Sequence, residues 1–170
     1  NLFNTVSNFD TGIGGISALG AAAVTRSTAE QYSGLGSLRV ATTAAANDGA
    51  RQIWTNLSVN TTYTLSAYAK ASVSNFSTFE MGYTDGTTFT SCLTGQTVST
   101  TNWQRYTCTF TTPATVARNA YFRQTDATAR VFFIDAMQVE VGSVATPYQS
   151  GTLNFSGMFT GPSVFRNQSD

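Results

Sequence analysis

A strict two-residue alternation over Asn60–Ala71 constrains the fold of this chain more than any other feature. The stretch reads NTTYTLSAYAKA, a short polar turn followed by side chains that alternate between two sets. One face carries Tyr63, Leu65, Ala67 and Ala69, and the other carries Thr64, Ser66, Tyr68 and Lys70. Alternation with β-favouring Thr and Tyr predicts a half-buried β-strand. We expect one face to join a core and the other to meet solvent or a ligand.

Further stretches of β character follow along the chain, separated by turn signals such as Asn47-Asp48-Gly49 and Asp85-Gly86. The glycine-rich residues 1–20 are predicted to form an irregular strand and loop. The run Val131–Ile134 is apolar on both faces, which predicts a central or covered strand. No segment shows a helical apolar period, so the pattern predicts a β-sandwich. The expected strands are 21–28, 37–42, 51–57, 60–71, 76–84, 89–93, 103–112, 120–124 and 130–140.

Charge is scarce in this chain. Charged residues make up 11% of the sequence, and the formal net charge is zero. A neutral chain lacks the electrostatic footprint of a protein that binds nucleic acid or an anionic membrane. No apolar segment has the length of a membrane span or the form of a signal peptide. We therefore expect no nucleic-acid partner and no membrane insertion, and a surface made polar by Thr, Ser, Asn and Gln.

The two cysteines, Cys92 and Cys108, leave two alternatives open. They cannot form a structural zinc site, because two ligands are too few and the chain has no histidine. A disulfide between them is one alternative. The other is that Cys108, which shares a strand face with Tyr106 and Phe110, is a small core residue.

Candidate catalytic groups are few. Without histidine, a Ser-His-Asp or Cys-His arrangement cannot form. Glycoside hydrolysis needs two carboxyl groups across a cleft, and the acidic residues form no recognisable pair. The glycines at 12–15 lack the strand, helix and lysine of a phosphate-binding loop. The sequence therefore predicts a protein that is not an enzyme.

Three blocks of sequence resemble carbohydrate-binding modules of the family 4/9/22 type: Tyr63–Ser72, Trp103–Pro113 and Phe133–Tyr148. The resemblance spans about residues 1–150 and implies an all-β, jelly-roll β-sandwich of two antiparallel sheets. The last block ends in QVEVGSVATPY, which looks like the version found in bacteriophage tail-fibre and particle-surface proteins. We expect Trp103, which opens a strand after a turn, to cap one end of the core rather than to stack on a sugar.

A module of this kind holds a glycan by aromatic stacking and by hydrogen bonds to hydroxyl groups. The candidates are side chains predicted to lie opposite the core, on the central strand and the strands before and after it. They are Trp54, Tyr68, Arg51, Lys70 and Tyr83, with Phe79 as an alternative to Tyr83. We hypothesise that Trp54 and Tyr68 line a groove on a concave sheet. The alternatives are a core or interface role for Trp54, and packing of Tyr68 under a loop.

The resemblance also implies a structural calcium between the N-terminal segment and the last strand. Asp10 and Asp135 stand at the matching positions. Calcium takes hard oxygen ligands, which include carbonyls of irregular loops. The alternative is that Asp10 caps a turn and Asp135 binds backbone amides.

The sequence divides into a predicted sandwich, residues 1–150, and a C-terminal tail, residues 151–170. The tail carries six large apolar residues, Leu153, Phe155, Met158, Phe159, Val164 and Phe165. We expect it to contact a sister copy or another virion subunit, and the alternative is that it packs on its own domain. The favoured function is a non-catalytic glycan-binding domain on a bacteriophage particle, as a decoration, fibre or host-adhesion protein. The alternatives are a module of a secreted glycoside hydrolase, placed outside the cell, and a spacer that binds no sugar.

Overall fold

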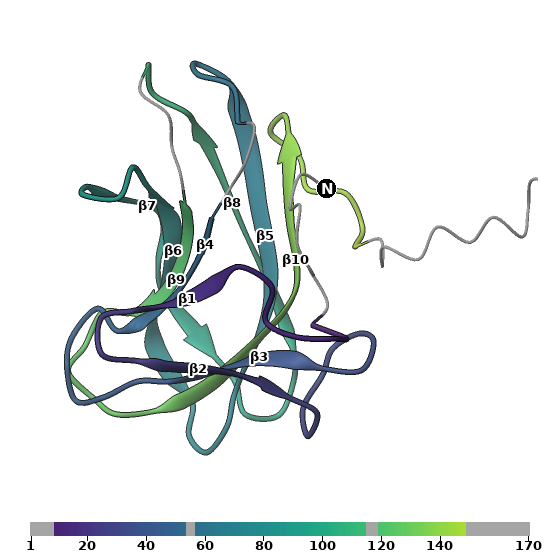
Figure 1. Cartoon of the computed structure of the whole chain (residues 1–170), viewed down its shortest axis with the longest axis vertical. Helices are drawn as coiled ribbons and strands as arrows, with labels where there is room; N and C mark the ends of the chain where they lie inside the picture. The colour runs from purple at the N-terminus through teal and green to yellow at the C-terminus, as the bar shows by residue number, and fades with distance from the viewer. Residues whose placement is uncertain (1–8, 54–56, 115–118, 149–170) are drawn as a thin grey trace, which may run out of the picture.

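The protein is a sandwich of two five-stranded antiparallel sheets (Figure 1). This computed structural model describes residues 9–53, 57–114 and 119–148, and that part of the chain contains strands but no helix. The first sheet is, in order, β1 (Ile16–Leu19), β4 (Gly49–Ile53), β9 (Asn119–Gln124), β6 (Phe76–Thr84) and β7 (Phe89–Val98). The second sheet is β2 (Ala23–Ser27), β3 (Ser37–Ala41), β10 (Val131–Val141), β5 (Thr62–Ala71) and β8 (Gln104–Thr111). The predicted all-β, jelly-roll class of fold is confirmed.

The core lies between the two sheets. The apolar face of β5 points into it, as the alternation predicts, and Leu65 and Ala69 are 0% exposed. From the first sheet, Phe79 and Phe122 meet this layer and are also fully buried. Burial of each large apolar side chain contributes about 1.5–3 kcal/mol, so this layer supplies most of the stabilisation of the sandwich.

Strand β10 is the centre of the second sheet, between β3 and β5. This position confirms the prediction from its apolar run. The register with β5 shifts between Asp135 and Gln138, and Ala136 has a positive φ of 50°. This β-bulge lets Asp135 and Gln138 both lie on the outer face, while Met137 points into the core.

Two strands differ from the sequence prediction. The prediction places a short strand at 89–93 and has Gly95 end it, but β7 continues to Val98. Gly95 adopts φ of 64°, a conformation that glycine reaches without strain, so it bends the edge strand instead of ending it. Strand β1 falls in the stretch predicted to be irregular, where a short edge strand pairs with β4.

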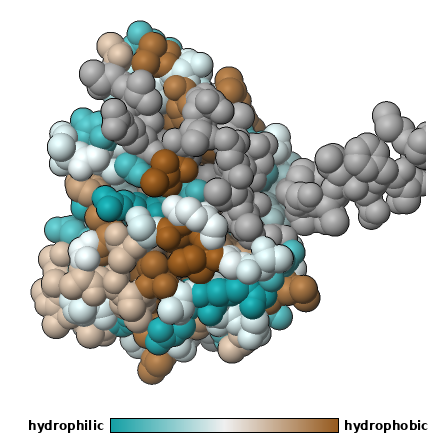
Figure 2. Space-filling model, viewed as in Figure 1, coloured by the Kyte–Doolittle hydropathy of each residue, from teal (hydrophilic) through white to brown (hydrophobic). Residues whose placement is uncertain are grey.

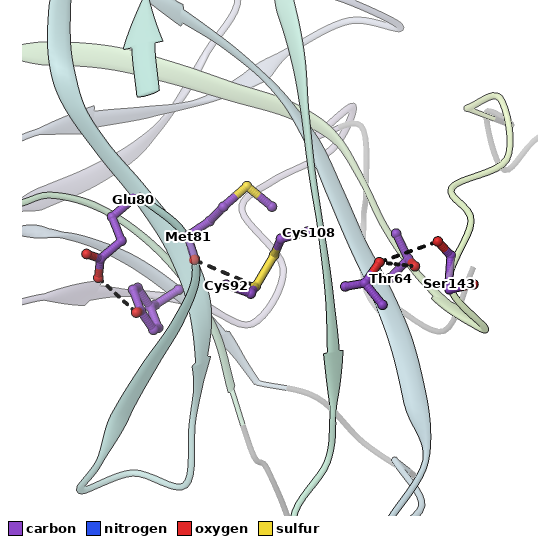
Figure 3. Close-up of a disulfide and its surroundings, with 8 residues drawn as sticks. Thr64, Glu80, Met81, Cys92, Cys108 and Ser143 are labelled. Carbon is purple, nitrogen blue, oxygen red and sulfur yellow. Dashed lines mark hydrogen bonds between the residues drawn. A yellow bond between two sulfur atoms is a disulfide. The ribbon is translucent and has the colours of Figure 1, made fainter. Parts of the chain in front are cut away.

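A disulfide joins Cys92 on β7 to Cys108 on β8, with Cα atoms 5.4 Å apart (Figure 3). It resolves the alternatives left open by the sequence, because Cys108 is bonded and also 5% exposed within the core. The two strands belong to different sheets. The bond is therefore a covalent link across the sandwich.

The outer faces are polar through hydroxyl groups. On the second sheet, cross-strand hydroxyl pairs join β5 to β8, with Thr62 bonded to Thr111 at 3.0 Å and Thr64 to Thr109 at 3.1 Å. Figure 2 shows hydrophobic side chains as separate groups among polar ones on the visible face. Within the described residues, no helix is long and apolar enough to cross a membrane.

Candidate functional site

A row of side chains crosses the outer face of the first sheet, the face that points away from the second sheet. Its members are successive register partners: Ser17 on β1, Arg51 on β4, Tyr121 on β9, Gly82 on β6 and Ser91 on β7. Gly82 leaves a gap in this row, and a Cβ atom there would lie 2.8 Å from the Tyr121 hydroxyl oxygen. The same Cβ atom would lie 2.1 Å from the Thr90 carbonyl oxygen, so only glycine fits here and the tyrosine hydroxyl occupies part of the space that a side chain would take.

Beside this row, Glu80 and Arg123 are register partners and form an ion pair, with 2.6 Å between Glu80 Oε1 and Arg123 Nη2. The same carboxylate oxygen accepts bonds from Arg123 Nε at 2.8 Å and from the Tyr121 hydroxyl at 2.9 Å. Burial and the bond to Glu80 raise the pKa of Tyr121, so its hydroxyl stays protonated and donates.

Aromatic rings complete this group, which we call the Glu80 cluster: Glu80, Phe89, Tyr121 and Arg123. The ring centroids of Phe89 and Tyr121 are 5.2 Å apart in an edge-to-face arrangement. The Arg123 guanidinium carbon lies 4.8 Å from the Tyr121 centroid and 5.2 Å from the Phe89 centroid, within range of a cation–π contact. Arg51 Nε donates to Ser17 Oγ at 3.0 Å. Glu80 is 7% exposed and Tyr121 is 0% exposed, so the partly exposed Arg51 and Arg123 are the charged groups that this face offers most directly to a hydroxyl-rich ligand.

Two predicted sugar-binding residues, Tyr68 and Lys70, lie on the outer face of the second sheet instead. The Tyr68 ring is stacked under Tyr32, with centroids 3.5 Å apart and planes at 13°. Lys70 Nζ pairs with Glu30 Oε2 at 2.7 Å. Both partners belong to the segment between β2 and β3, so the structure favours the alternative that Tyr68 packs under a loop.

The prediction that Phe79 or Tyr83 faces away from the core is wrong. Phe79, Met81 and Tyr83 do share one face of β6, as expected, but that face points at the second sheet. Phe79 is 0% exposed, and the Tyr83 ring stacks on Phe110 of β8 with centroids 4.6 Å apart. Alternation identifies which residues share a face, but it does not say which face is buried.

The five predicted residues therefore do not gather on one surface. Arg51 lies on the first sheet, Tyr68 and Lys70 lie on the second, and Tyr83 lies between the sheets. Trp54 is outside the described residues. Trp103, expected to cap the core, makes an edge contact to Tyr32 instead, with centroids 6.4 Å apart.

A cleft of about 630 Å³ opens on the outer face of the second sheet. Arg105 of β8 lies at this cleft, and its Nη2 donates to Ser66 Oγ at 2.9 Å, to Gln138 Oε1 at 2.9 Å and to the Thr146 carbonyl at 2.6 Å. The last bond holds the segment after β10 against this sheet. The residues that line the cleft are Tyr32, Ser33, Tyr68, Arg105, Pro147 and Tyr148.

Comparison with known families decides the class of this protein. Residues 4–125 match the family model described as "Carbohydrate binding domain", for modules of families 4 and 9. This chain belongs to the carbohydrate binding domain family. The matched residues include Arg51 and the whole Glu80 cluster. A search of curated proteins found no match.

Solved carbohydrate-binding modules share the fold of this domain. The CBM22-1 xylan-binding domain of Paenibacillus barcinonensis Xyn10C superposes with a TM-score of 0.70 at 20% identity, over 82% of this chain and 94% of that one. The C-terminal family 22 module of Clostridium thermocellum Xyn10B gives 0.69 at 24% identity, over 85% and 97%. A xylan-binding domain from CBM 22 gives 0.71 at 22% identity, over 85% and 97%. Domains of this type are non-catalytic, as the sequence predicts for this chain.

The sequence prediction missed all four residues of the Glu80 cluster. Strand β9 reads NAYFRQ, and its alternation places Tyr121 and Arg123 on one face. Glu80, between Phe79 and Met81 on β6, is the signal that the opposite face of that strand is the polar one. The sequence alone does not show that β6 pairs with β9, and this pairing brings Glu80 next to Tyr121 and Arg123.

The residues implied as calcium ligands both contact the segment between β2 and β3. Asp135 is 0% exposed, and its carboxylate accepts backbone N–H bonds from Tyr32 at 2.8 Å, Ser33 at 3.0 Å and Ala136 at 2.7 Å. Burial raises the pKa of Asp135 to about 6; these three bonds oppose the rise, and the charge of Asp10 adds to it.

The two carboxylates are hard oxygen donors, the type of ligand that calcium takes. A carboxylate offers about four lone-pair positions, so Asp135 keeps acceptor capacity beyond its three N–H bonds. Asp10, whose Oδ1 accepts the Leu35 N–H at 2.5 Å, is a second hard oxygen donor beside it. Among the described residues, no group of three or more acidic, histidine or cysteine side chains gathers. The remaining ligands would therefore be carbonyl oxygens or water.

Proposed function

We propose that this domain binds a neutral glycan on the outer face of the first sheet, through the Glu80 cluster and Arg51. The observation that carries this proposal is the fixed geometry around the Glu80 carboxylate, which three donor groups of Tyr121 and Arg123 hold in place. A sandwich does not need a buried ion pair on its outer face for stability. The attraction within such a pair offsets little more than the cost of removing its two charges from water. Preorganised charged groups do lower the cost of binding a polar ligand.

Sugar hydroxyl groups both donate and accept hydrogen bonds. Glu80 accepts, Arg51 and Arg123 donate, and the Phe89 ring offers an apolar surface for the C–H face of a sugar ring. Trp54, which lies outside the described residues, stays in this proposal as a further stacking residue because a tryptophan ring offers a large apolar surface to a sugar ring. Xylan is the first ligand to test, since similar modules are xylan-binding domains.

Affinity electrophoresis on xylan and a panel of other neutral polysaccharides tests this proposal. Glu80→Gln and Trp54→Ala are each expected to weaken retardation about tenfold or more, the effect of losing a charged hydrogen bond or a stacked ring. Asp126→Asn is the matched control, because Asp126 also forms an ion pair, with Arg130. Retardation by a glycan that persists unchanged in both variants would contradict the proposal.

We further propose that the domain is displayed on a bacteriophage particle, where glycan binding would serve host adhesion or decoration. The phrase QVEVGSVATPY and the apolar residues of 151–170 support this context. A module of a secreted glycoside hydrolase is the competing proposal, favoured by the likeness to modules of xylanases. Light scattering separates them: the phage proposal expects an oligomer that is lost in a chain ending at residue 150, and the hydrolase proposal expects a monomer.

Calcium is a separate proposal. Asp10 and Asp135 would hold the ion, which would neutralise two nearby carboxylates and tie the N-terminal segment to β10. The melting temperature at neutral pH is then expected to fall on addition of EDTA and to recover with excess CaCl₂. Asp135→Asn should abolish this response. A melting temperature that is indifferent to EDTA and to CaCl₂ would contradict the proposal.

A further inference from the structure

Arg105 brings an unneutralised positive charge to the cleft on the second sheet. Its hydrogen-bond partners are a hydroxyl, an amide oxygen and a backbone carbonyl, and none of them is charged. Within the described residues Arg105 has no ion pair, and its Nε is buried without a hydrogen-bond partner. A guanidinium that is partly desolvated and lacks a counter-charge gains more from an anionic ligand than an exposed one does.

The same cleft has aromatic walls. Tyr32 is 41% exposed, and it is fixed from below by its stack on Tyr68, whose ring centroid lies 5.9 Å from the Arg105 guanidinium carbon. The backbone N–H groups of Tyr32 and Ser33 are anchored on Asp135. The opposite wall is the segment that includes Pro147 and Tyr148. The cleft volume falls within the range of about 300–1,000 Å³ that is typical of sites for small ligands.

We propose that this cleft is a second site, which binds a sugar residue carrying a carboxylate, such as a hexuronic acid. The carboxylate would pair with Arg105, whose Nη1 makes no hydrogen bond within the described residues. The tyrosine rings would pack against the sugar ring, and the Tyr and Ser hydroxyls would bond its hydroxyl groups. This site is on the opposite sheet from the Glu80 cluster and does not depend on it.

The charges around the cleft favour a sugar residue that carries a single negative charge. Lys70 is paired with Glu30, Asp135 is buried beneath the loop, and Glu140 accepts bonds from Thr146. Arg105 is therefore the one uncompensated cation that lines this cleft, which matches one carboxylate. A phosphate monoester, which carries a charge of about −2, would be expected to recruit more than one cation.

The test is calorimetric titration of the full chain with trigalacturonic acid and with its methyl ester, which has the same sugar skeleton without the charge. We expect the acid to bind about tenfold or more tightly than the ester, and to weaken as NaCl is raised. Arg105→Gln should remove this preference, whereas Arg39→Gln, an arginine on the same sheet outside the cleft lining, should keep it. Equal binding of acid and ester, or a preference that survives Arg105→Gln, would overturn the proposal.

Two further measurements keep the test decisive if Arg105→Gln does not fold. Tyr32→Ala changes an exposed loop residue and is expected to weaken binding of the acid about tenfold. Tri-glutamate, an acidic peptide of similar charge, should bind more weakly than trigalacturonic acid. Unchanged binding in Tyr32→Ala, or a peptide that binds as tightly as the sugar, would contradict a sugar site. Neutral xylan binding, measured in parallel, reports on the first sheet alone.

Discussion

At the scale of single residues, Arg26 connects three separate backbone positions with one side chain. Its Nε donates to the Phe9 carbonyl at 2.6 Å, and its Nη2 donates to the carbonyls of Asp10 at 2.7 Å and Leu35 at 2.9 Å. Gly36 makes room for this contact, since a Cβ atom there would lie 2.7 Å from the Phe9 carbonyl oxygen. Arg26 thus fixes the N-terminal segment against the loop that supports the cleft.

Arg26→Met is expected to lower the free energy of unfolding by about 3 kcal/mol, because it leaves carbonyl oxygens without donors. Arg39→Met is the matched control. Arg39 lies on the neighbouring strand β3, and no side-chain hydrogen bond of Arg39 occurs within the described residues. Urea denaturation should show a loss at least twice as large for Arg26→Met. Equal losses would show that the carbonyl bonds do not stabilise the fold.

Asp48 joins two turns in a similar way. Its Oδ1 accepts the Ala21 N–H at 2.8 Å, and its Oδ2 accepts both the N–H and the hydroxyl of Thr43, at 2.8 and 2.6 Å. Burial alone would raise the pKa of Asp48, but the bonds from Thr43 and Ala21 outweigh it and hold the pKa below its usual value of 3.8. The ionised form is therefore the one that the fold stabilises.

The lowered pKa of Asp48 determines how the stability of the fold changes with pH. A carboxyl with a lowered pKa in the folded state adds stability above its unfolded pKa, and that stability is lost as the pH falls through the folded pKa. The melting temperature of the wild type should therefore fall steeply below about pH 4. Asp48→Asn, which cannot ionise, should melt lower at neutral pH and lose less over the same range. Parallel curves for the two proteins would contradict this role.

At the scale of elements, the two edge strands β7 and β8 belong to different sheets and carry the disulfide. An edge strand such as β7 is hydrogen-bonded to a neighbouring strand on one side only, here β6. The bond closes a loop with a sequence separation of 16 residues. It therefore ties the edge of one sheet to the edge of the other.

Replacing both cysteines, Cys92→Ser with Cys108→Ala, is expected to lower the free energy of unfolding by about 3 kcal/mol, the loop-closure effect for a loop of this length. Reduction of the wild type by dithiothreitol should lower the melting temperature similarly. The doubly substituted protein is the control, since its melting temperature should not respond to dithiothreitol. A wild type with the same melting temperature in both redox states would contradict a stabilising role.

The sequence predicts elements well where alternation is strict. Strands β5, β6 and β8 were located within about two residues, the usual uncertainty of element ends, because apolar and polar positions alternate over most of their length. Strand β1 and the second half of β7 were missed, because glycines interrupt both stretches and the edge pairing that orders them is not visible in the local pattern. The bulge at Ala136 was also not predicted, since only the register with β5 requires it.

At the scale of the whole molecule, two sheets provide two outer faces with different chemistry. The first carries the Glu80 cluster, with paired charges and aromatic rings, and the second carries the cleft with the unpaired charge of Arg105. The sequence predicted the β-sandwich fold, the non-catalytic class of the domain and the position of Arg51 on an outer face. It did not predict which candidates share a sheet, because β4 and β5 are consecutive in sequence but belong to different sheets.

The central claim, that neutral glycan binds the outer face of the first sheet, is tested most directly by NMR. Backbone amide shifts of the full chain would be followed while xylohexaose, or the neutral oligosaccharide found to bind best, is added. We predict that the largest shifts cluster on β4, β6, β7 and β9, together with the side-chain Nε–H signal of Arg123. Shifts confined to β2, β3, β10, β5 and β8 would contradict the claim, as would the absence of any shift at millimolar oligosaccharide.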